Sequence, residues 1–362
     1  MLTKKLYFSS TATLALILAT FAASNVMNSA PRNASLAATA VGSASGYHLL
    51  KKIPLGGEGG WDYLAFDSPT RRLFISRGTK VVVVNVDTGT VAGEIANTDG
   101  VHGIAFAPEF DRGFTSNGHS GTVTIFDLQT LQVIGSAKTG MNPDAIVYDP
   151  ASKRVFTMNG HSNDATAIDA ATGTVLGMIP VTGKPEFAVA DGAGHVYVNL
   201  EDKSEELQID TKNLKVTAQW PLAPCQEPSG LAMDIAHRRL FAGCHNEMMA
   251  VVDADSGKVI ATPAIGDGVD ANAFDPGTAF AFASNGMSAT LTVVHEDAPD
   301  KFSVLENVAT QRGARTMALD PKSHEVYLVT ADFAPAPPSA NENPKPRMMP
   351  VPGSFVVLIY TK

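Results

Sequence analysis

The sequence repeats itself with a period of about 40 to 45 residues, and this repeat constrains the fold more than any other feature. The first unit reads Ala-Phe-Asp at residues 65–67 and Arg-Leu-Phe-Ile at 72–75, followed by a run of valines at 81–84. The opening segment returns at residues 105–106, 147–149, 188–191, 232–234, 273–275 and 318–320. The aromatic residue of the second segment is present in every unit, at Phe74, Phe114, Phe156, Tyr197, Phe241, Phe282 and Tyr327. The chain therefore contains seven units.

Each unit holds four short segments rich in β-branched residues, separated by turn residues. A four-stranded sheet of this size cannot bury both of its faces alone, so the units must stack around a common axis. The sequence therefore predicts an all-β fold, a seven-bladed β-propeller of four-stranded blades, over residues 46–362. The turns that separate the segments are Asp-Pro at residues 149–150, 275–276 and 320–321, and Asn-Gly at 117–118, 159–160 and 285–286.

The two ends of the repeat array predict how the ring closes. The last unit contains three predicted strands, around Met317 and within residues 326–329 and 355–360. Residues 46–58 are left over before the first blade and have the pattern of an outer strand. We expect them to form the outermost strand of the last blade, because that blade would otherwise expose an unpaired edge. A Pro-rich stretch at residues 334–352 is expected to be a surface loop of the same blade.

The N-terminal residues have the charge and hydropathy order of a secretory signal. Lys4 and Lys5 precede an uncharged apolar run at residues 14–21, which is too short to span a bilayer. A membrane anchor or a buried helix is the alternative, but the chain continues into Ala, Ser and Asn as exported leaders do. We therefore expect residues 1–45 to be a signal peptide and flexible leader, and the mature chain, without a membrane span, to be periplasmic or secreted.

Charge, cysteine content and missing motifs narrow the function. The formal net charge is -9, and binding to nucleic acid or anionic lipid needs a basic face instead. The only two cysteines, Cys225 and Cys244, fall in one unit and predict a disulfide, with free thiols or a metal site with His245 as alternatives. The sequence lacks the motifs of covalent haem attachment, phosphate-binding loops and serine-hydrolase elbows, which argues against those three chemistries.

A hairpin motif late in the units carries a resemblance to a known family. It reads Asp-Thr-Gly-Thr-Val at residues 87–91, and it follows the pattern Asp-x-x-Thr/Ser-Gly-x-Val at 169–175 and 253–259. Together with the Asp-Pro after the first strand, this motif resembles the YncE-like, YVTN-repeat family of bacterial periplasmic propellers, over nearly all of the mature chain. The resemblance implies a seven-bladed propeller and a non-enzymatic binding or scaffolding role in the cell envelope.

Aligning the units on the Asp that ends the first strand reveals a column of polar residues five places earlier. In a propeller these residues enter the innermost strands, so they should surround the mouth of the central channel. Carboxylates that share an axis repel one another unless a cation or a polar ligand lies among them, so we predict a ligand-binding ring. Trp61 could extend it by stacking on the ligand. The alternative is that these residues cap strands and hold bridging water. The members of this polar ring are Asp62, His102, Asp144, Glu186, Ser229, Asp270 and Arg315.

A second column comes from the turns between the second and third strands, five residues after each aromatic. His119 and His161 each follow an Asn-Gly pair, and with His102 they could form an imidazole-rich metal site. The alternative is that Asn-Gly plus a polar residue only makes a tight hairpin turn. The column comprises Thr79, His119, His161, Asp202, Asn246, Met287 and Asp332.

Three functions are compatible with these patterns. The first is an exported cell-envelope propeller, expected to be a monomer, that binds a small polar ligand or an envelope protein on the channel-mouth face without catalysis. The second is a divalent-metal-dependent hydrolase of the lactonase type, a class that resembles this chain in fold. The third is a propeller partner of a redox enzyme. Metal bound to the purified protein would separate the second function from the first. The predicted ligands of a divalent cation are Asp62, Asp144, Glu186, Asp270 and Asn272.

Overall fold

The first repeat unit folds as four antiparallel strands, and its valine run forms the third of them. The side chains of successive strand residues point to opposite faces. Val81 and Val83 therefore pack toward the second blade, whereas Val84 packs toward the last blade. Because both faces of the sheet are buried, the valines follow one another without polar residues between them. The strands of this blade are β2 (Leu64–Asp67), β3 (Arg72–Arg77), β4 (Lys80–Asn85) and β5 (Thr90–Ile95).

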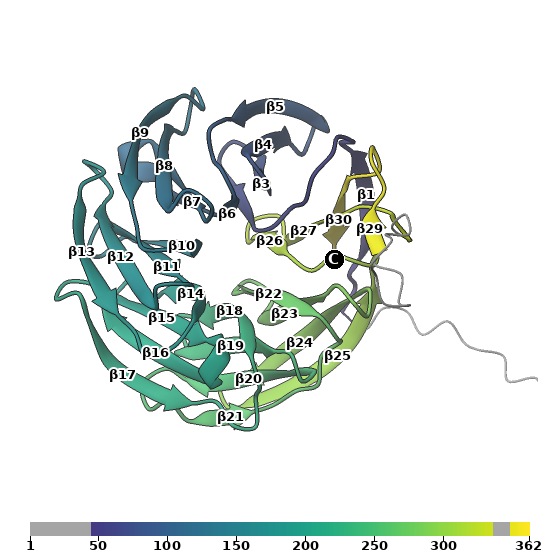
Figure 1. Ribbon diagram of the computed structural model, residues 1–362. Helices are drawn as coiled ribbons and strands as arrows, with labels where there is room; N and C mark the ends of the chain where they lie inside the picture. The colour runs from purple at the N-terminus through teal and green to yellow at the C-terminus, as the bar shows by residue number, and fades with distance from the viewer. Residues whose placement is uncertain (1–44, 336–347) are drawn as a thin grey trace, which may run out of the picture. The chain divides into compact units, whose positions relative to one another are not determined.

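Seven such sheets are arranged radially around one axis (Figure 1). The computed structural model describes residues 45–335 and 348–362, which belong to one compact unit, and it confirms the all-β, seven-bladed propeller predicted from the repeat. Blades two to six each follow the sequence order of their strands.

The strands of the second blade are β6 (Val101–Ala107), β7 (Arg112–Asn117), β8 (Thr122–Asp127) and β9 (Val133–Lys138). Those of the third are β10 (Pro143–Asp149), β11 (Arg154–Asn159), β12 (Asp164–Asp169) and β13 (Val175–Pro180). Those of the fourth are β14 (Pro185–Ala190), β15 (His195–Leu200), β16 (Glu205–Asp210) and β17 (Lys215–Pro221). Those of the fifth are β18 (Pro228–Asp234), β19 (Arg239–Cys244), β20 (Met248–Asp253) and β21 (Val259–Ala261). Those of the sixth are β22 (Val269–Asp275), β23 (Phe280–Asn285), β24 (Thr290–Ala298) and β25 (Lys301–Ala309). The short 3-10 helices η1 (Pro108–Phe110) and η2 (Glu201–Lys203) follow β6 and β15.

The seventh blade is assembled from the two ends of the propeller. Its inner strands are β26 (Met317–Asp320) and β27 (Glu325–Thr330), and β30 (Val356–Thr361) pairs with β27. The N-terminal strand β1 (His48–Pro54) pairs antiparallel with β30, where the purple and yellow ends of the colour scale meet in Figure 1. This pairing confirms that an N-terminal strand closes the ring. It also covers the edge that β30 would otherwise expose.

The predicted Pro-rich loop leaves the last blade as a two-stranded ribbon. The strands β28 (Phe333–Pro335) and β29 (Met348–Pro350) pair with each other at its base. The rest of this loop, residues 336–347, and residues 1–44 of the predicted leader lie outside the described residues. The part of the chain that the structure describes contains no helix that is both long and apolar enough to cross a membrane.

The Thr-Gly hairpin motif has a local physical cause. The side chain of Asn85 accepts a hydrogen bond from the N–H of Thr88 at 2.9 Å, and Gly89 turns the chain back with φ of 71°. In the equivalent hairpin of the third blade, Asp169 accepts the same hydrogen bond from the N–H of Thr172, and Gly173 has φ of 77°. A residue with a Cβ atom is strained at these angles, so the turn favours glycine at this position. Leu131 and Leu214 adopt the same left-handed backbone at the equivalent positions of the second and fourth blades.

The core consists of the seams between neighbouring blades, and the aromatic residue of each second strand is fully buried there in all seven units. Across the seam between the last and the first blade, for example, the rings of Phe66 and Tyr327 stack with centroids 4.5 Å apart. Each blade thus packs against its two neighbouring blades, as expected of a repeat protein. In the fifth blade, Cys225 and Cys244 form a disulfide with Cα atoms 5.6 Å apart, which ties the loop before β18 to the end of β19.

Candidate functional site

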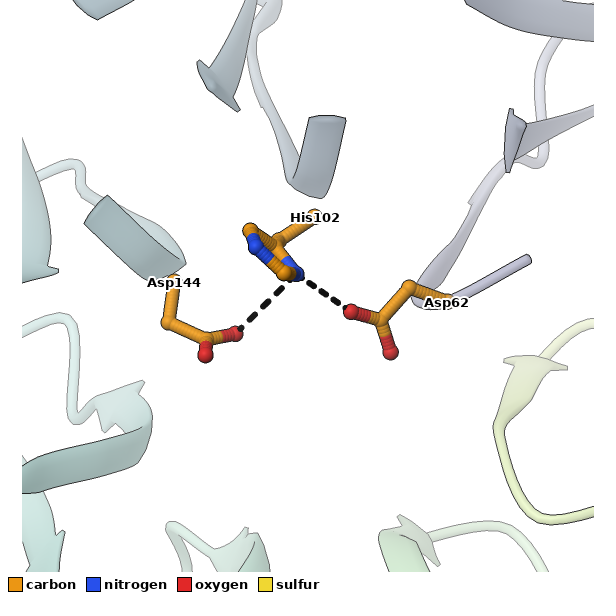
Figure 2. A group of neighbouring side chains, drawn as sticks. All are labelled: Asp62, His102 and Asp144. Atoms are coloured by element: carbon orange, nitrogen blue, oxygen red, sulfur yellow. Dashed lines mark hydrogen bonds and ion pairs between the residues drawn. The ribbon is translucent and has the colours of Figure 1, made fainter. Parts of the chain in front are cut away.

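The structure places the polar ring at one end of the innermost strands. Asp62 and Arg315 lie two residues before β2 and β26, and the other five members are each the second residue of an innermost strand. In these five blades the pairing between the innermost and the second strand shifts register at this point. A bulge of this kind turns a side chain out of the regular ladder. The polar side chains can therefore point toward the axis, as Figure 2 shows for Asp62, His102 and Asp144.

The imidazole of His102 lies between two carboxylates from the neighbouring blades (Figure 2). Its Nδ1 atom is 2.5 Å from Oδ2 of Asp62 and 3.7 Å from Oδ1 of Asp144. Burial lowers the pKa of His102, but the hydrogen bond to Asp62 and the charges of Asp144 and Glu186 outweigh it, so the net effect is a raised pKa. These contacts thus favour the cationic form of His102, which compensates part of the negative charge of the ring.

Arg315 compensates the carboxylates on the other side of the ring. Its Nε atom lies 2.5 Å from Asp270, and its Nη2 atom lies 3.3 Å from Asp62. Burial lowers the pKa of Arg315, but the charges of Asp270 and Asp62 outweigh it, and the pKa is raised. Ser229 donates a hydrogen bond to the same Asp270 at 3.1 Å. Asp62 therefore joins the two halves of the ring, since it contacts both His102 and Arg315.

Asp144 and Glu186, in adjacent blades, are the least compensated members of the ring. Burial is the largest cause that raises the pKa of both groups, and each is raised further by neighbouring carboxylates. Among the described residues, the lysine that pairs with Glu186 is Lys184, whose Nζ atom is 3.2 Å from Oε2 but also pairs with Glu201. The four carboxylates of the ring thus face three cationic side chains, one of which is shared with a carboxylate outside the ring. The Asp144–Glu186 side retains capacity for a proton, a cation or a hydrogen-bond donor.

Tyr63 and Phe187 were not identified from the sequence, yet they lie directly beside the polar ring. Each follows a ring residue in the chain, and their rings, from the first and fourth blades, are 5.0 Å apart. Burial raises the pKa of the Tyr63 phenol well above its ordinary value, and four carboxylates of the ring add to the effect. The phenol therefore stays protonated and can donate a hydrogen bond near the carboxylates. The sequence feature that could have identified them is side-chain size. Among the residues that directly follow a ring residue, Tyr63 in the first blade and Phe187 in the fourth are large aromatics, whereas Ala145 in the third is small.

Several predicted site residues lie apart from the ring. Trp61 is 7% exposed and packs against Phe355 with centroids 5.2 Å apart, so its place is in the core rather than on a ligand-facing surface. Asn272 is buried in the seam with the fifth blade, where its Oδ1 atom faces Gly230 and Gly243. Neither polar atom of the Asn272 side chain has a hydrogen-bond partner among the described residues.

The predicted metal ligands are only partly brought together. The ligand atoms of Asp62, His102 and Asp144 all lie within 4.8 Å of one another. Within the described ranges, this group includes neither the predicted ligands Glu186, Asp270 and Asn272 nor the two other histidines proposed to join His102. Those histidines, His119 and His161, instead line an open groove of about 700 Å³ between the second and third blades.

A second hollow lies beside the Pro-rich ribbon and contains a buried arginine. The guanidinium of Arg77 stacks over the ring of Phe355 at 3.6 Å and donates a hydrogen bond to the carbonyl of Glu58 at 2.7 Å. Burial lowers the pKa of Arg77, and within the described residues its Nη1 atom has no hydrogen-bond partner. The cavity measures about 390 Å³ and is also lined by Met349 and Val351. A cationic and partly apolar cavity therefore lies beside the turn between the second and third strands of the first blade.

Comparison with known proteins identifies the fold but not a family. No protein-family model matches the chain, and no curated protein matches it. Among solved structures, the hydrazine synthase of Kuenenia stuttgartiensis is similar, with a TM-score of 0.66 and 16% sequence identity. The similarity covers 74% of this chain and 92% of the other. At this level of identity the comparison supports the propeller architecture and carries no residue roles.

Proposed function

We propose that this chain is an exported cell-envelope propeller, of the YncE-like kind that its repeats resemble, which binds a small cationic or hydroxyl-rich ligand at the polar ring. The ligand would lie on the Asp144–Glu186 side, where carboxylates exceed cations. Arg315 would meet an acidic or hydroxyl group on the same ligand, because its guanidinium is half-exposed. The protein acts by binding, without catalysis.

The observation that carries this proposal is the largely buried, undercompensated pair of carboxyl groups, whose side chains are 15% exposed in Asp144 and 12% exposed in Glu186. An ionised carboxylate in a buried site is costly unless it is paired and hydrogen-bonded, and the raised pKa values of Asp144 and Glu186 express that cost. A ligand ammonium group or hydroxyl would stabilise the ionised form of these groups in place of a bound proton. The phenol of Tyr63 is a further donor beside the same carboxylates.

Two features support export. The N-terminal residues have the charge and hydropathy order of a secretory signal. The disulfide between Cys225 and Cys244 is a modification that persists in oxidising compartments such as the periplasm. Both are consistent with a ligand or an envelope protein as the partner.

A divalent-metal-dependent hydrolase of the lactonase type is the second candidate. It is favoured by the Asp62, His102 and Asp144 group, whose ligand atoms lie within 4.8 Å. These residues could hold a divalent cation that activates water or polarises a carbonyl group. The contacts of the ring favour binding instead, because His102 and Arg315 already pair with Asp62, one of the carboxylates that the cation would need.

The test is calorimetric titration of the full chain with three probes, Ca²⁺, 1,4-diaminobutane and trehalose. We expect binding of the diamine or the sugar and no lactone hydrolysis with added Ca²⁺. The double variant Asp144→Asn with Glu186→Gln should lose this binding, because it removes both carboxylates without changing side-chain size. A charge-matched control replaces the exposed Glu94 and Asp111 by Gln and Asn and should bind as the parent does.

Two outcomes would reject the proposal. If none of the probes binds, the ring does not have this ligand chemistry. If the double variant binds a probe as tightly as the parent does, the ligand lies elsewhere and the ring is structural. Selective, saturable Ca²⁺ binding with lactone hydrolysis would favour the hydrolase.

A further inference from the structure

A second group of metal-ligating side chains lies at the opposite end of the innermost strands from the polar ring. Asp234 is the last residue of β18, His237 lies in the turn that follows, and Glu296 belongs to β24 of the next blade. The Nδ1 atom of His237 is 2.6 Å from Oδ2 of Asp234 and 2.9 Å from Oε1 of Glu296. The ligand atoms of all three residues lie within 4.8 Å of one another.

Three of the six other seams share one arrangement at this position. The Asp that ends the innermost strand pairs with a cationic side chain of the following blade. That side chain is in each case the fourth residue after the corresponding Asp of its own blade, and its backbone is left-handed. The pairs are Asp320–Arg71 at 2.6 Å, Asp191–Arg238 at 3.0 Å and Asp275–His324 at 2.7 Å.

The seam between the fifth and sixth blades departs from this arrangement. The fourth residue after Asp275 is Ala279, which keeps the left-handed backbone with φ of 56° but supplies no cation to Asp234. The carbonyl of Ala279 accepts the N–H of Glu296 at 2.9 Å. In five other blades the equivalent N–H belongs to a buried, uncharged residue. These residues are Val86, Leu128, Ala170, Thr211 and Ala254.

This seam therefore lacks the cation that three other seams have, and it contains a buried carboxylate where five other blades have an uncharged residue. The side chain of Glu296 is 2% exposed and that of Asp234 is 3% exposed. Neither oxygen of Glu296 nor Oδ2 of Asp234 has a partner with hydrogen-bond geometry among the described residues. In the same ranges His237 is the one Lys, Arg or His side chain within 4.0 Å of either carboxylate. One imidazole cannot compensate two buried carboxylates, and leaving them uncompensated is costly.

The neighbouring arginines do not relieve this charge. Arg238 pairs with Asp191 and with an exposed carboxylate, Asp255, and Arg239 pairs with Asp253 and Asp300. Both guanidinium groups are thus committed to other carboxylates.

We propose that Asp234, His237 and Glu296 bind a divalent ion of the Zn²⁺ class, which bridges the fifth and sixth blades. One imidazole nitrogen and two carboxylate oxygens form a ligand set that Zn²⁺ and neighbouring transition-metal ions prefer. The ion takes the place of the cationic side chain that three other seams use. Three protein ligands leave a coordination position for water, and His237 is half-exposed, so an ion can enter from solvent. This inference is independent of the ligand proposed for the polar ring.

The test is Zn²⁺ binding to the full chain after removal of metal with a chelator, followed by equilibrium dialysis against micromolar Zn²⁺. The key variant is His237→Ala. His102→Ala is a matched control, because His102 also lies between two carboxylates but at the polar ring. We expect one tight equivalent in the parent and in His102→Ala. His237→Ala should bind at least about 100-fold more weakly, since even outer-shell substitutions cost 10- to 100-fold in metal affinity. Zn²⁺ should also raise the melting temperature of the parent but not of His237→Ala.

Glu296→Val supplies a second variant, because it introduces the residue that Val86 provides in the first blade. It should fold stably and lose the tight Zn²⁺ equivalent. The proposal is overturned if the parent takes up no Zn²⁺, if His237→Ala binds it as the parent does, or if only His102→Ala loses it. The last outcome would assign the ion to the polar ring.

Discussion

Replacing Glu206 with leucine should stabilise this protein strongly at alkaline pH. Glu206 is fully buried in β16, and neither of its carboxylate oxygens has a hydrogen-bond partner among the described residues. It pairs in register with Asn199 of β15. The residues paired in the same way in the six other blades are all apolar and fully buried. They are Val81, Val123, Ala165, Met249, Leu291 and Val357.

The size of the effect follows from the pKa of this carboxyl group. Burial raises the pKa of Glu206 from 4.5 to about 8. At about 1.4 kcal/mol per pKa unit, the ionised carboxylate costs on the order of 5 kcal/mol in a rigid structure, and relaxation with water entry reduces this to about 2–4 kcal/mol. Because the folded-state pKa is raised, the folded protein holds this proton between pH 4.5 and about 8 while the unfolded chain releases it. The contribution to stability therefore falls as pH rises through that window.

The assay is urea unfolding of the parent and Glu206→Leu at pH 5 and pH 9. We expect the variant to exceed the parent by about 2–4 kcal/mol at pH 9 and by much less at pH 5, where the carboxyl group is protonated. Glu94→Gln is a control, because Glu94 is exposed on β5 and should show no such pH-dependent gain. If Glu206→Leu is equally destabilising at both pH values, the carboxylate has a stabilising partner and the reasoning is refuted.

Three further predictions concern closure, the disulfide and the polar ring. Deleting residues 46–58 should cause a large loss of soluble yield, because β1 closes the ring. Ile53, which is 3% exposed, packs in this closure, and Ile53→Ala should lower the free energy of unfolding by about 2–4 kcal/mol. An unchanged urea midpoint of Ile53→Ala would contradict the closure. Thiol titration in denaturant should find no free thiols. Replacing Cys225 and Cys244, which are 19 residues apart, with serine should lower the free energy of unfolding in urea by about 3 kcal/mol. Two titrating thiols in protein purified from the envelope would exclude the disulfide. Diamine affinity, measured by calorimetry, should rise with pH as Asp144 and Glu186 lose protons at their raised pKa values. The double amide variant should abolish this pH dependence. A pH-independent affinity in the parent would contradict the prediction.

The sequence alone was sufficient for the architecture. A repeated order of β-branched segments and turns, with one aromatic per unit, determines the blade, because these preferences act within about 40 residues. The strand missing from the last unit and the extra segment before Trp61 also predicted the closure that β1 and β30 make. The alignment of units further identified which residues enter the polar ring, and their role in binding stays a prediction.

The tertiary structure decided how these residues are paired. Bulges in the innermost strands turn the ring side chains toward the axis, and Asp62 then contacts both His102 and Arg315 from the two adjacent blades. Arg315 is 253 positions away from Asp62, and only closure of the ring brings the two together. Sequence periodicity describes each blade but not the charge balance between blades. The same limit hid the seam at Glu296, because the buried carboxylate of Asp234 in the fifth blade becomes significant only when the sixth blade is seen to provide Ala279 in place of a cation and Glu296 as a second carboxylate.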